Sequence, residues 1–319
     1  MKLRVLVGLI SAVLTPLILT ACRGDLTAPV TGPPLVWSSV PSSTTLSLSA
    51  VWGSSASDVW AVGNLDPQGG TMLHYDGTSW SSVMSGTFLK AVWGSSPSDV
   101  WAVGCCGTVL LHYNGTTWSN LSGASTQKLL GVWGTSASNV WAVGSGGTIW
   151  HYNGASWSSV QSGITEDLLS VWGSSASDVW ALADGGGILH YNGTKWSAVF
   201  GGTTDVLIGV WGSSASDVWA VGGVASGPTF LHYDGTSWTA AYAPPTIDVW
   251  AIWGTSASNV WVVGWAGGTP QTMVHYDGTS WSTASSTNTE QLHGVWGSSA
   301  SDVWIVGDHG TILHGTPAR

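Results

Sequence analysis

The tripeptide Val-Trp-Gly recurs along this chain of 319 residues, once as Ile-Trp-Gly, with its Trp at positions 52, 93, 133, 172, 211, 253 and 296. The spacings are 41, 40, 39, 39, 42 and 43 residues. Each unit holds four short apolar runs separated by turn residues, and the mature chain has no amphipathic helical stretch. A period near forty residues with strand-like units predicts a β-propeller.

The two ends of the repeat region complement each other. Residues 36–40 (Val-Trp-Ser-Ser-Val) match the fourth run of the unit near Trp157, whereas the last unit stops after its third run at His314. A strand from the N-terminus would therefore complete the last blade and remove an open sheet edge. We predict an all-β fold: a seven-bladed β-propeller of four-stranded blades over residues 36–315, closed by the N-terminal strand, with residues 316–319 as a tail.

Tryptophan is the residue type that best indicates the core. Of the 24 Trp, 21 occupy three equivalent positions in each unit, which favours an aromatic core between blades. Three Trp lie outside these positions: Trp150, Trp250 and Trp265.

Each unit also repeats polar residues that we interpret as structural. Asp and Asn interchange before the second run, at 58, 99, 139, 178, 217, 259 and 302, which favours turn capping over metal binding. One His per unit precedes the turn after the third run, and seven such sites would lie too far apart to share a metal. The Asp-Gly or Asn-Gly that follows predicts a two-residue type I′ hairpin turn.

The repeat VWGSSASDVWAVG, followed by segments such as LHYDGTSW, resembles a repeat family of bacterial secreted propellers that is grouped with WD40-like and Asp-box repeats. It is similar, more weakly, to tectonin-type lectin repeats. The resemblance covers nearly all of residues 36–315 and implies a propeller that often binds ligands. It implies no catalytic residue, because the spacing here departs from the Asp-box pattern.

The N-terminus predicts export and lipid attachment. Lys2 and Arg4 precede an apolar stretch that is too short for a membrane span, and Leu19-Thr20-Ala21-Cys22 resembles a bacterial lipobox. We therefore expect a signal peptide over residues 1–21, a lipidated Cys22, and a Pro- and Gly-containing tether over residues 22–35. This predicts a lipid-anchored protein of the bacterial cell envelope, periplasmic or surface-exposed, and Arg23 favours the outer membrane.

Charge and composition argue against several functions. The formal net charge of −10 disfavours nucleic acid as a partner. A sialidase site needs clustered arginines, and the mature chain has only Arg23 and Arg319. We expect no cofactor, no metal site and no catalytic residue. A polysaccharide hydrolase or lyase with paired carboxylates near the axis stays an alternative. Cys105 and Cys106 could form a vicinal disulfide or be two turn cysteines without a function.

The seven copies differ most in two sets of loops, those after the second run and those before the first. Variable loops on a rigid repeat usually carry binding specificity. The sixth and seventh units stand out there, and we predict a binding site for a glycan or a protein, with an envelope scaffold as a further alternative. Both a stacking role and a packing role predict that Trp265 lies close to Trp250 and Tyr242. The candidate ligand-binding residues are Tyr242, Asp248, Trp250, Trp265, Gln271, His293, Asp308 and His309.

Overall fold

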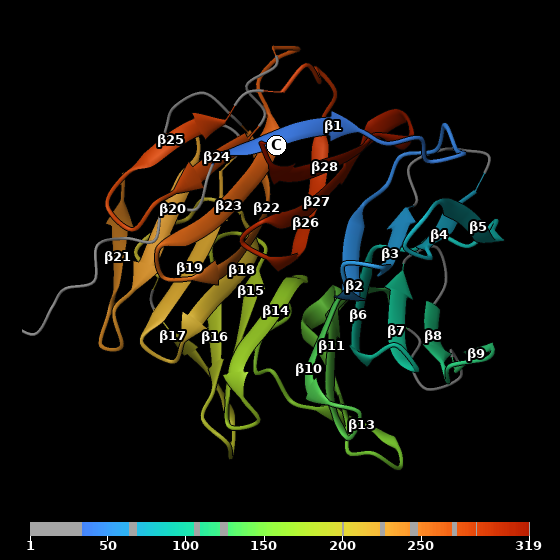
Figure 1. The fold of residues 1–319 in the computed structure, drawn as a ribbon. Helices are drawn as coiled ribbons and strands as arrows, with labels where there is room; N and C mark the ends of the chain where they lie inside the picture. Colours follow the sequence, from blue (N-terminus) through green and yellow to red (C-terminus); the bar gives the residue numbers. More distant parts are fainter. Residues whose placement is uncertain are drawn as a thin grey trace, which may run out of the picture. The chain divides into compact units, whose positions relative to one another are not determined.

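The fold is a seven-bladed β-propeller, in agreement with the prediction. The computed structural model describes residues 34–63, 69–104, 109–121, 127–199, 201–223, 227–242, 248–269, 273–284 and 286–318. Seven four-stranded antiparallel sheets form the blades, and the inner strands contact one another in a closed ring (Figure 1). In this described part the helical residues belong to the 3₁₀ turns η2 (Ser145–Gly147) and η3 (Asp308–Gly310), and no helix there could cross a membrane.

Every blade runs outward from an inner strand that faces the axis. The inner strands of blades 1 to 7 are β2 (Ala50–Ser55), β6 (Ala91–Ser96), β10 (Leu129–Ser136), β14 (Leu168–Ser175), β18 (Leu207–Ser214), β22 (Asp248–Ser256) and β26 (Leu292–Ser299). The second strands are β3 (Asp58–Gly63), β7 (Asp99–Gly104), β11 (Asn139–Gly144), β15 (Asp178–Ala183), β19 (Asp217–Gly222), β23 (Asn259–Trp265) and β27 (Asp302–Gly307).

The outer half of each blade is more exposed. The third strands are β4 (Thr71–Tyr75), β8 (Val109–Tyr113), β12 (Thr148–Tyr152), β16 (Ile188–Tyr191), β20 (Thr229–Tyr233), β24 (Met273–Tyr276) and β28 (Ile312–Pro317). The outer strands are β5 (Trp80–Ser85), β9 (Trp118–Asn120), β13 (Trp157–Val160), β17 (Trp196–Val199), β21 (Trp238–Ala241), β25 (Trp281–Ala284) and, in blade 7, β1 (Leu35–Ser39).

The N-terminal strand closes the ring as predicted. Strand β1 pairs with β28 from Leu35 opposite Pro317 to Ser39 opposite Leu313. In Figure 1 the blue β1 lies along the dark red β28. Blade 7 is therefore built from both ends of the described chain.

The repeated Trp-Gly pair makes the contact between neighbouring inner strands. A Cβ atom added to Gly53 would lie 2.6 Å from the indole of Trp296 in the preceding blade, which is too close for any side chain. The same contact recurs around the ring, at 2.5 to 2.8 Å from each added Cβ. The pairs are Trp296–Gly53, Trp52–Gly94, Trp93–Gly134, Trp133–Gly173, Trp172–Gly212, Trp211–Gly254 and Trp253–Gly297.

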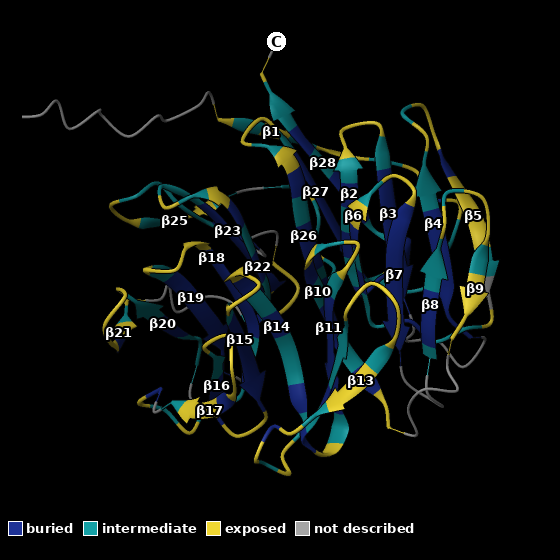
Figure 2. Cartoon of the chain, turned by 90° about the horizontal axis from the view of Figure 1, so that it is seen from below, coloured by how far each residue is buried: buried dark blue, intermediate teal, exposed yellow. Residues whose placement is uncertain are grey.

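A second aromatic ring lies farther from the axis. The Trp of each outer strand meets the Trp of the second strand in the preceding blade edge to face, with centroids 5.2 to 5.5 Å apart and planes at 78° to 86°. Trp37 of β1 supplies the last of these pairs, with Trp261. The second strands are almost wholly buried, as the dark blue of β3, β7 and β19 shows in Figure 2. The predicted aromatic core between blades is confirmed.

The repeated Asp and His form a network across three strands. In blade 5 Asp217 Oδ2 accepts a hydrogen bond from Ser213 Oγ at 2.5 Å, and Asp217 Oδ1 lies 2.7 Å from His232 Nε2. The His232 ring lies over Trp219, with centroids 4.3 Å apart. Turn capping is thus only part of the role of this Asp, because the carboxylate also fixes the third strand. Equivalent pairs are Asp58–His74, Asp99–His112, Asp178–His190 and Asp302–His314.

Two blades carry Asn in this network. Asn259 Oδ1 lies 2.7 Å from His275 Nε2, while Asn259 Nδ2 donates to Thr255 Oγ1 at 2.8 Å. In blade 3 the equivalent Asn139 Oδ1 and His151 Nε2 are buried without a partner. Burial lowers the pKa of both His151 and His275, so these two imidazoles are neutral at neutral pH.

The predicted two-residue turn between third and outer strands is wrong. Tyr75 is the partner of Trp80, so four residues form the loop. Asp76 Oδ1 accepts hydrogen bonds from the backbone N–H of Thr78 and Ser79, both at 2.9 Å, and Gly77 takes a positive φ of 91°. The side chain of Asp76 thus supplies the acceptor for the Ser79 N–H, while the Asp76 N–H donates to the Ser79 carbonyl at 3.4 Å.

Deleting residues 34–41 tests the closure. Strand β28 would lose its outer neighbour and expose an unpaired edge, so we expect a melting temperature lower by about 10 °C or more, together with aggregation. Calorimetry and size-exclusion chromatography measure both effects. The variant Trp118→Ala is a control that removes the equivalent Trp–Trp contact but keeps every strand pair, and it should lose less. An unchanged melting temperature in the deletion would contradict the closing role of β1.

The blade 5 network predicts a graded response at one position. Asp217→Ala leaves His232 and Ser213 without their acceptor and should cost about 1–2 kcal/mol of unfolding free energy. Asp217→Asn should cost less than about 1 kcal/mol, because Asn259 in blade 6 contacts the equivalent His and hydroxyl, with its amide nitrogen donating to the hydroxyl oxygen. Urea unfolding at pH 7 measures both values. Equal losses for the two variants would contradict this role.

The same network predicts a pH dependence. Burial raises the pKa of Asp217, but the hydrogen bonds with His232 and Ser213 together lower it by more. The pKa of Asp217 therefore lies below its ordinary value. Such a carboxyl stabilises the fold above its unfolded pKa of about 4, and this contribution is lost as the pH falls through the folded pKa. Asp217→Asn should therefore show a smaller fall in stability below pH 4 than the parent.

Candidate functional site

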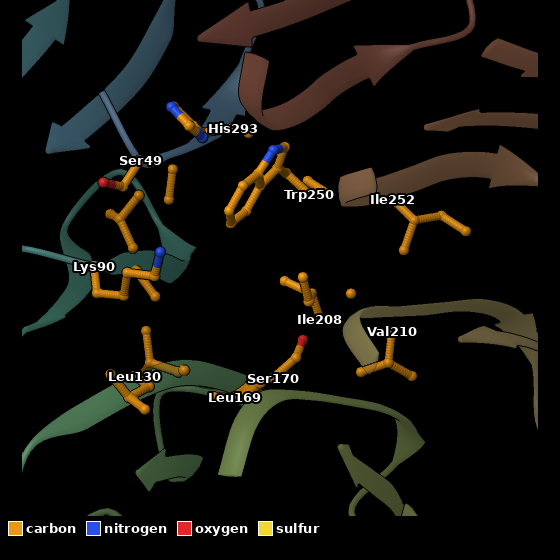
Figure 3. Close-up of a pocket in the computed structure, with 18 of the residues that line it drawn as sticks. Ser49, Lys90, Leu130, Leu169, Ser170, Ile208, Val210, Trp250, Ile252 and His293 are labelled. Carbon is orange, nitrogen blue, oxygen red and sulfur yellow. The ribbon is translucent and has the colours of Figure 1, made fainter. Parts of the chain in front are cut away.

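A cavity of about 240 Å³ lies on the propeller axis. Three consecutive residues from each of the seven inner strands, or from the turn just before them, line it, and Figure 3 shows their side chains arranged around one opening. These residues form three stacked rings of seven. We call them the mouth ring, the middle ring and the floor ring, in the order in which each chain segment passes through them.

The mouth ring is the only one of the three whose chemistry varies widely. The middle ring holds only small residues, Ala50, Ala91, Gly131, Ser170, Gly209, Ala251 and Gly294. The floor ring holds Val51, Val92, Val132, Val171, Val210, Ile252 and Val295. The mouth ring consists of Ser49, Lys90, Leu130, Leu169, Ile208, Trp250 and His293. It lies at the start of the inner strands, on the side of the loops that differ between copies.

A β-bulge directs mouth-ring side chains toward the axis. The pairing of β22 with β23 shifts between Val249 and Ala251, so Trp250 is an extra residue without a partner. The same shift occurs at Leu130, Leu169, Ile208 and His293. Bulges commonly re-aim a side chain beside a functional site. The preceding residue, such as Val249, is buried in the blade, so the bulge separates core from cavity.

The middle ring is small because the inner strands converge there. A Cβ on Gly294 would lie 3.0 Å from Ala50 Cα in the next blade, and one on Gly209 would lie 3.1 Å from Ile252 Cγ2. At these two glycine positions a side chain would push the strands apart. The mouth ring is thus the first level on the axis where large side chains fit.

Two predicted residues meet at the mouth. The rings of Trp250 and His293 touch edge to face, with centroids 5.5 Å apart. Asp308 of η3 holds His293, with Oδ1 2.8 Å from Nε2. Burial lowers the pKa of His293, Asp308 raises it, and the positive charge of Lys90 lowers it again, so the pKa lies below its ordinary value. The imidazole is therefore neutral at neutral pH, and Lys90 carries the positive charge of the mouth ring.

Other predicted residues lie outside the cavity lining. Asp248 pairs with Trp265 at the end of the β22–β23 ladder. Trp265 is 36% exposed and Tyr242 is 75% exposed. Within the described residues, no ring contact joins Trp265 to Trp250 or Tyr242, so the expected aromatic cluster is not found. Trp150 is partly buried and packs against the hydrophobic cluster between blades 2 and 3.

His309 belongs to the rim of blade 7. It adopts a left-handed backbone with φ of 54°, and its Nδ1 lies 2.9 Å from Glu290 Oε2 on the exposed surface. The Glu290 carboxylate raises the pKa of His309 above its ordinary value. Gln271, Cys22, Cys105 and Cys106 lie outside the described residues.

Sequence reasoning missed five of the seven mouth-ring residues: Ser49, Lys90, Leu130, Leu169 and Ile208. The prediction placed the site in the loops of unequal length, whereas the mouth ring lies at the start of the inner strands. One signal for these residues was present in the sequence. When the seven repeats are compared, the residue two before each Val-Trp or Ile-Trp changes in chemistry, whereas the rest of the strand is nearly uniform.

The cavity lining contains no acidic residue in the part of the chain that the structure describes. The axial carboxylate pair that the hydrolase alternative requires is therefore not found among these residues. The same described residues contain no group of three or more His, Cys, Asp or Glu that could hold a metal ion.

Comparisons with known proteins agree on the fold. No protein-family model matches this sequence, and neither does any curated protein. Among similar solved structures, YCF48 bound to D1 peptide is 16% identical, with a TM-score of 0.71 over 90% of this chain and 100% of that chain. Virginiamycin B lyase from Staphylococcus aureus with quinupristin is 10% identical, with a TM-score of 0.75 over 89% and 100%.

A third similar structure is the WD40 β-propeller domain of Doa1, which is 13% identical, with a TM-score of 0.71 over 90% of this chain and 98% of that chain. Identities this low support a shared architecture and carry no functional residue across. The chain is thus similar to WD40-type and related propellers, and its function has to be argued from its own residues.

Proposed function

We propose that this protein is a binding propeller that receives a protein ligand on its variable-loop face, with the axial cavity as the central contact. One observation carries the proposal. Within seven nearly identical inner strands, one position varies in chemistry, and its seven side chains form the mouth ring.

The mouth ring is not needed to hold the blades together. The Trp–Gly contacts, the Trp–Trp pairs and the buried second strands already form the core. Trp250, Leu130 and Ile208 are nevertheless large, apolar and only half-buried at the opening. Apolar side chains that converge on a cavity with a few polar groups are typical of a binding site.

The lining favours a protein over a sugar. A sugar needs several hydrogen-bond partners, whereas four neighbouring mouth-ring residues, at 130, 169, 208 and 250, offer aliphatic or aromatic surface. Similar propellers include one solved with a bound peptide. Trp is also among the residues that most often dominate the energy of protein interfaces.

The variant Trp250→Ala tests the axial site. Peptides selected from a displayed random library on the full chain should bind this variant at least about 10-fold more weakly, because a central Trp contact is lost. Trp265→Ala is the matched control, since Trp265 is an exposed Trp in the same blade outside the cavity lining; it should change binding less than about threefold. Fluorescence anisotropy of labelled peptides measures both affinities.

Two results would contradict the axial site. One is peptide binding that Trp265→Ala weakens while Trp250→Ala leaves it unchanged, which would move the site to the rim. The other is a glycan array that gives pocket-dependent binding where the peptide library gives none. Equal melting temperatures of both variants and the parent establish that they are folded.

We also propose that Cys22 anchors the protein in the bacterial envelope, as the lipobox-like Leu19–Cys22 suggests. The first strand of the propeller, β1, begins at Leu35, so a lipid on Cys22 would leave the blades unmodified.

The variant Cys22→Ser should abolish labelled palmitate incorporation and shift the protein from the membrane fraction to the soluble fraction. Cell fractionation with immunoblotting measures the shift. Cys105→Ser is the control and should change neither readout. Continued labelling of Cys22→Ser would contradict the anchor.

A further inference from the structure

The middle ring of the axial cavity carries one polar side chain, that of Ser170 in blade 4. Its neighbours in the ring are Gly131 of blade 3 and Gly209 of blade 5, which have no side chains. In Figure 3 the oxygen of Ser170 points from its strand toward the opening. The Ser170 hydroxyl therefore has open space beside it, at a level where the other six blades place a methyl group or a hydrogen atom.

The Ser170 hydroxyl makes no hydrogen bond within the part of the chain that the structure describes, and its oxygen is not sealed in the interior. The polar side chains of the mouth ring differ in this respect. Ser49 and Lys90 each already have an interaction within the protein. Asp308 engages His293, with Oδ1 2.8 Å from Nε2. Ser170 thus offers a ligand a donor and an acceptor that no described protein group uses.

The walls of the cavity on this side are apolar. Leu169 and Ile208 belong to the mouth ring above Ser170, and the floor ring below it consists of Val and Ile. Trp250 lies farther round the mouth, and because its N–H is buried, the indole offers carbon surface to a ligand. A wholly apolar group placed here would take water away from the Ser170 hydroxyl without replacing the hydrogen bond, which is unfavourable. The lining therefore fits a group with an apolar body and a hydrogen-bonding tip.

The size and depth of the cavity limit the occupant further. Its volume is about 240 Å³. Pockets for drug-sized ligands are usually larger, roughly 300–1,000 Å³, whereas an apolar protein cavity of roughly 150 Å³ is enough to bind benzene. The space thus suits one aromatic ring with its substituent. Ser170 lies one residue below the mouth ring, about 3.3 Å along the strand, so a side chain that reaches it from a chain above the mouth has to be long.

On the basis of the proposed function, we infer that the axial cavity receives one tyrosine side chain of a protein ligand. The phenol ring packs among Leu169, Ile208 and the indole of Trp250, and aromatic pairs of this kind are favourable beyond the area that they bury. The phenol hydroxyl shares a hydrogen bond with Ser170 Oγ. A phenylalanine would leave the Ser170 hydroxyl unpaired, and a serine or threonine would be too short to reach it.

Two labelled peptides test this inference on the full chain. One is Ser-Gly-Ser-Tyr-Ser-Gly, blocked at both ends so that terminal charges play no role, and the other has Phe in place of Tyr. Fluorescence anisotropy should show that the parent binds the tyrosine peptide at least about fivefold more tightly, because the phenylalanine peptide buries the Ser170 hydroxyl without a partner. Ser170→Ala should bring this ratio close to one. Ser119→Ala is the matched control, since Ser119 is an exposed serine of β9 outside the cavity lining, and it should leave the ratio unchanged.

A third probe, p-cresol, distinguishes a tyrosine of a protein from a small free phenol. We expect it to displace the tyrosine peptide only at much higher concentration than the unlabelled peptide does, since it lacks the contacts that flanking residues make with the mouth ring. Displacement by p-cresol at the same concentration as by the peptide would overturn the assignment to a protein ligand.

Failure of the inference and failure of the proposed function look different. If the two peptides bind equally, if Ser170→Ala keeps the ratio, or if neither peptide binds while library peptides still depend on Trp250, the tyrosine inference is overturned and the binding function stands. If no library peptide depends on Trp250, the proposed function itself is overturned. Ser170→Ala is expected to fold, because Ala occupies the same ring position in blades 1, 2 and 6, and a melting temperature equal to that of the parent establishes this.

Discussion

The contact of an inner-strand Trp with the Gly of the next blade determines the geometry of the whole ring. Each indole occupies the space where a Cβ would be, so neighbouring inner strands approach more closely than two ordinary side chains allow. Because the contact is repeated seven times and returns to its start, every blade is fixed by both neighbours. Trp and Gly recur together in the sequence because they are the two halves of one contact.

Farther out, the edge-to-face Trp pairs repeat this nearest-neighbour arrangement at larger radius. Trp37 shows that the arrangement does not depend on chain order, since a residue from the N-terminus completes the same contact on Trp261 that internal residues complete elsewhere. In blade 7, Gly315 replaces the Tyr of the other third strands, and Trp37 packs directly over it. The closing strand therefore fits its blade specifically.

The fold was predictable from the sequence because the repeats, their period and the complementary ends all follow from local patterns. The site was only partly predictable. Trp250 and His293 were predicted because they depart from the repeat. The cavity that they line together with Lys90, however, depends on a bulge. Simple alternation along β22 gives no sign that Trp250 is an extra residue that turns toward the axis. The turn after the third strand was mispredicted because the Asp76 side chain accepts from the N–H groups of Thr78 and Ser79, which stabilises a loop of four residues between Tyr75 and Trp80.

The bulge at the mouth has a consequence for how such a protein can change. Each blade contributes one side chain to the opening. In blades 3 to 7 that side chain belongs to the bulge, outside the ladder that holds its blade, so it can be exchanged without rebuilding the core. Around the axis this chain displays Ser, Lys, Leu, Leu, Ile, Trp and His. The seven mouth-ring side chains then determine selectivity on a constant scaffold. Gene duplication followed by single-codon changes at these positions would be enough to produce a different selectivity.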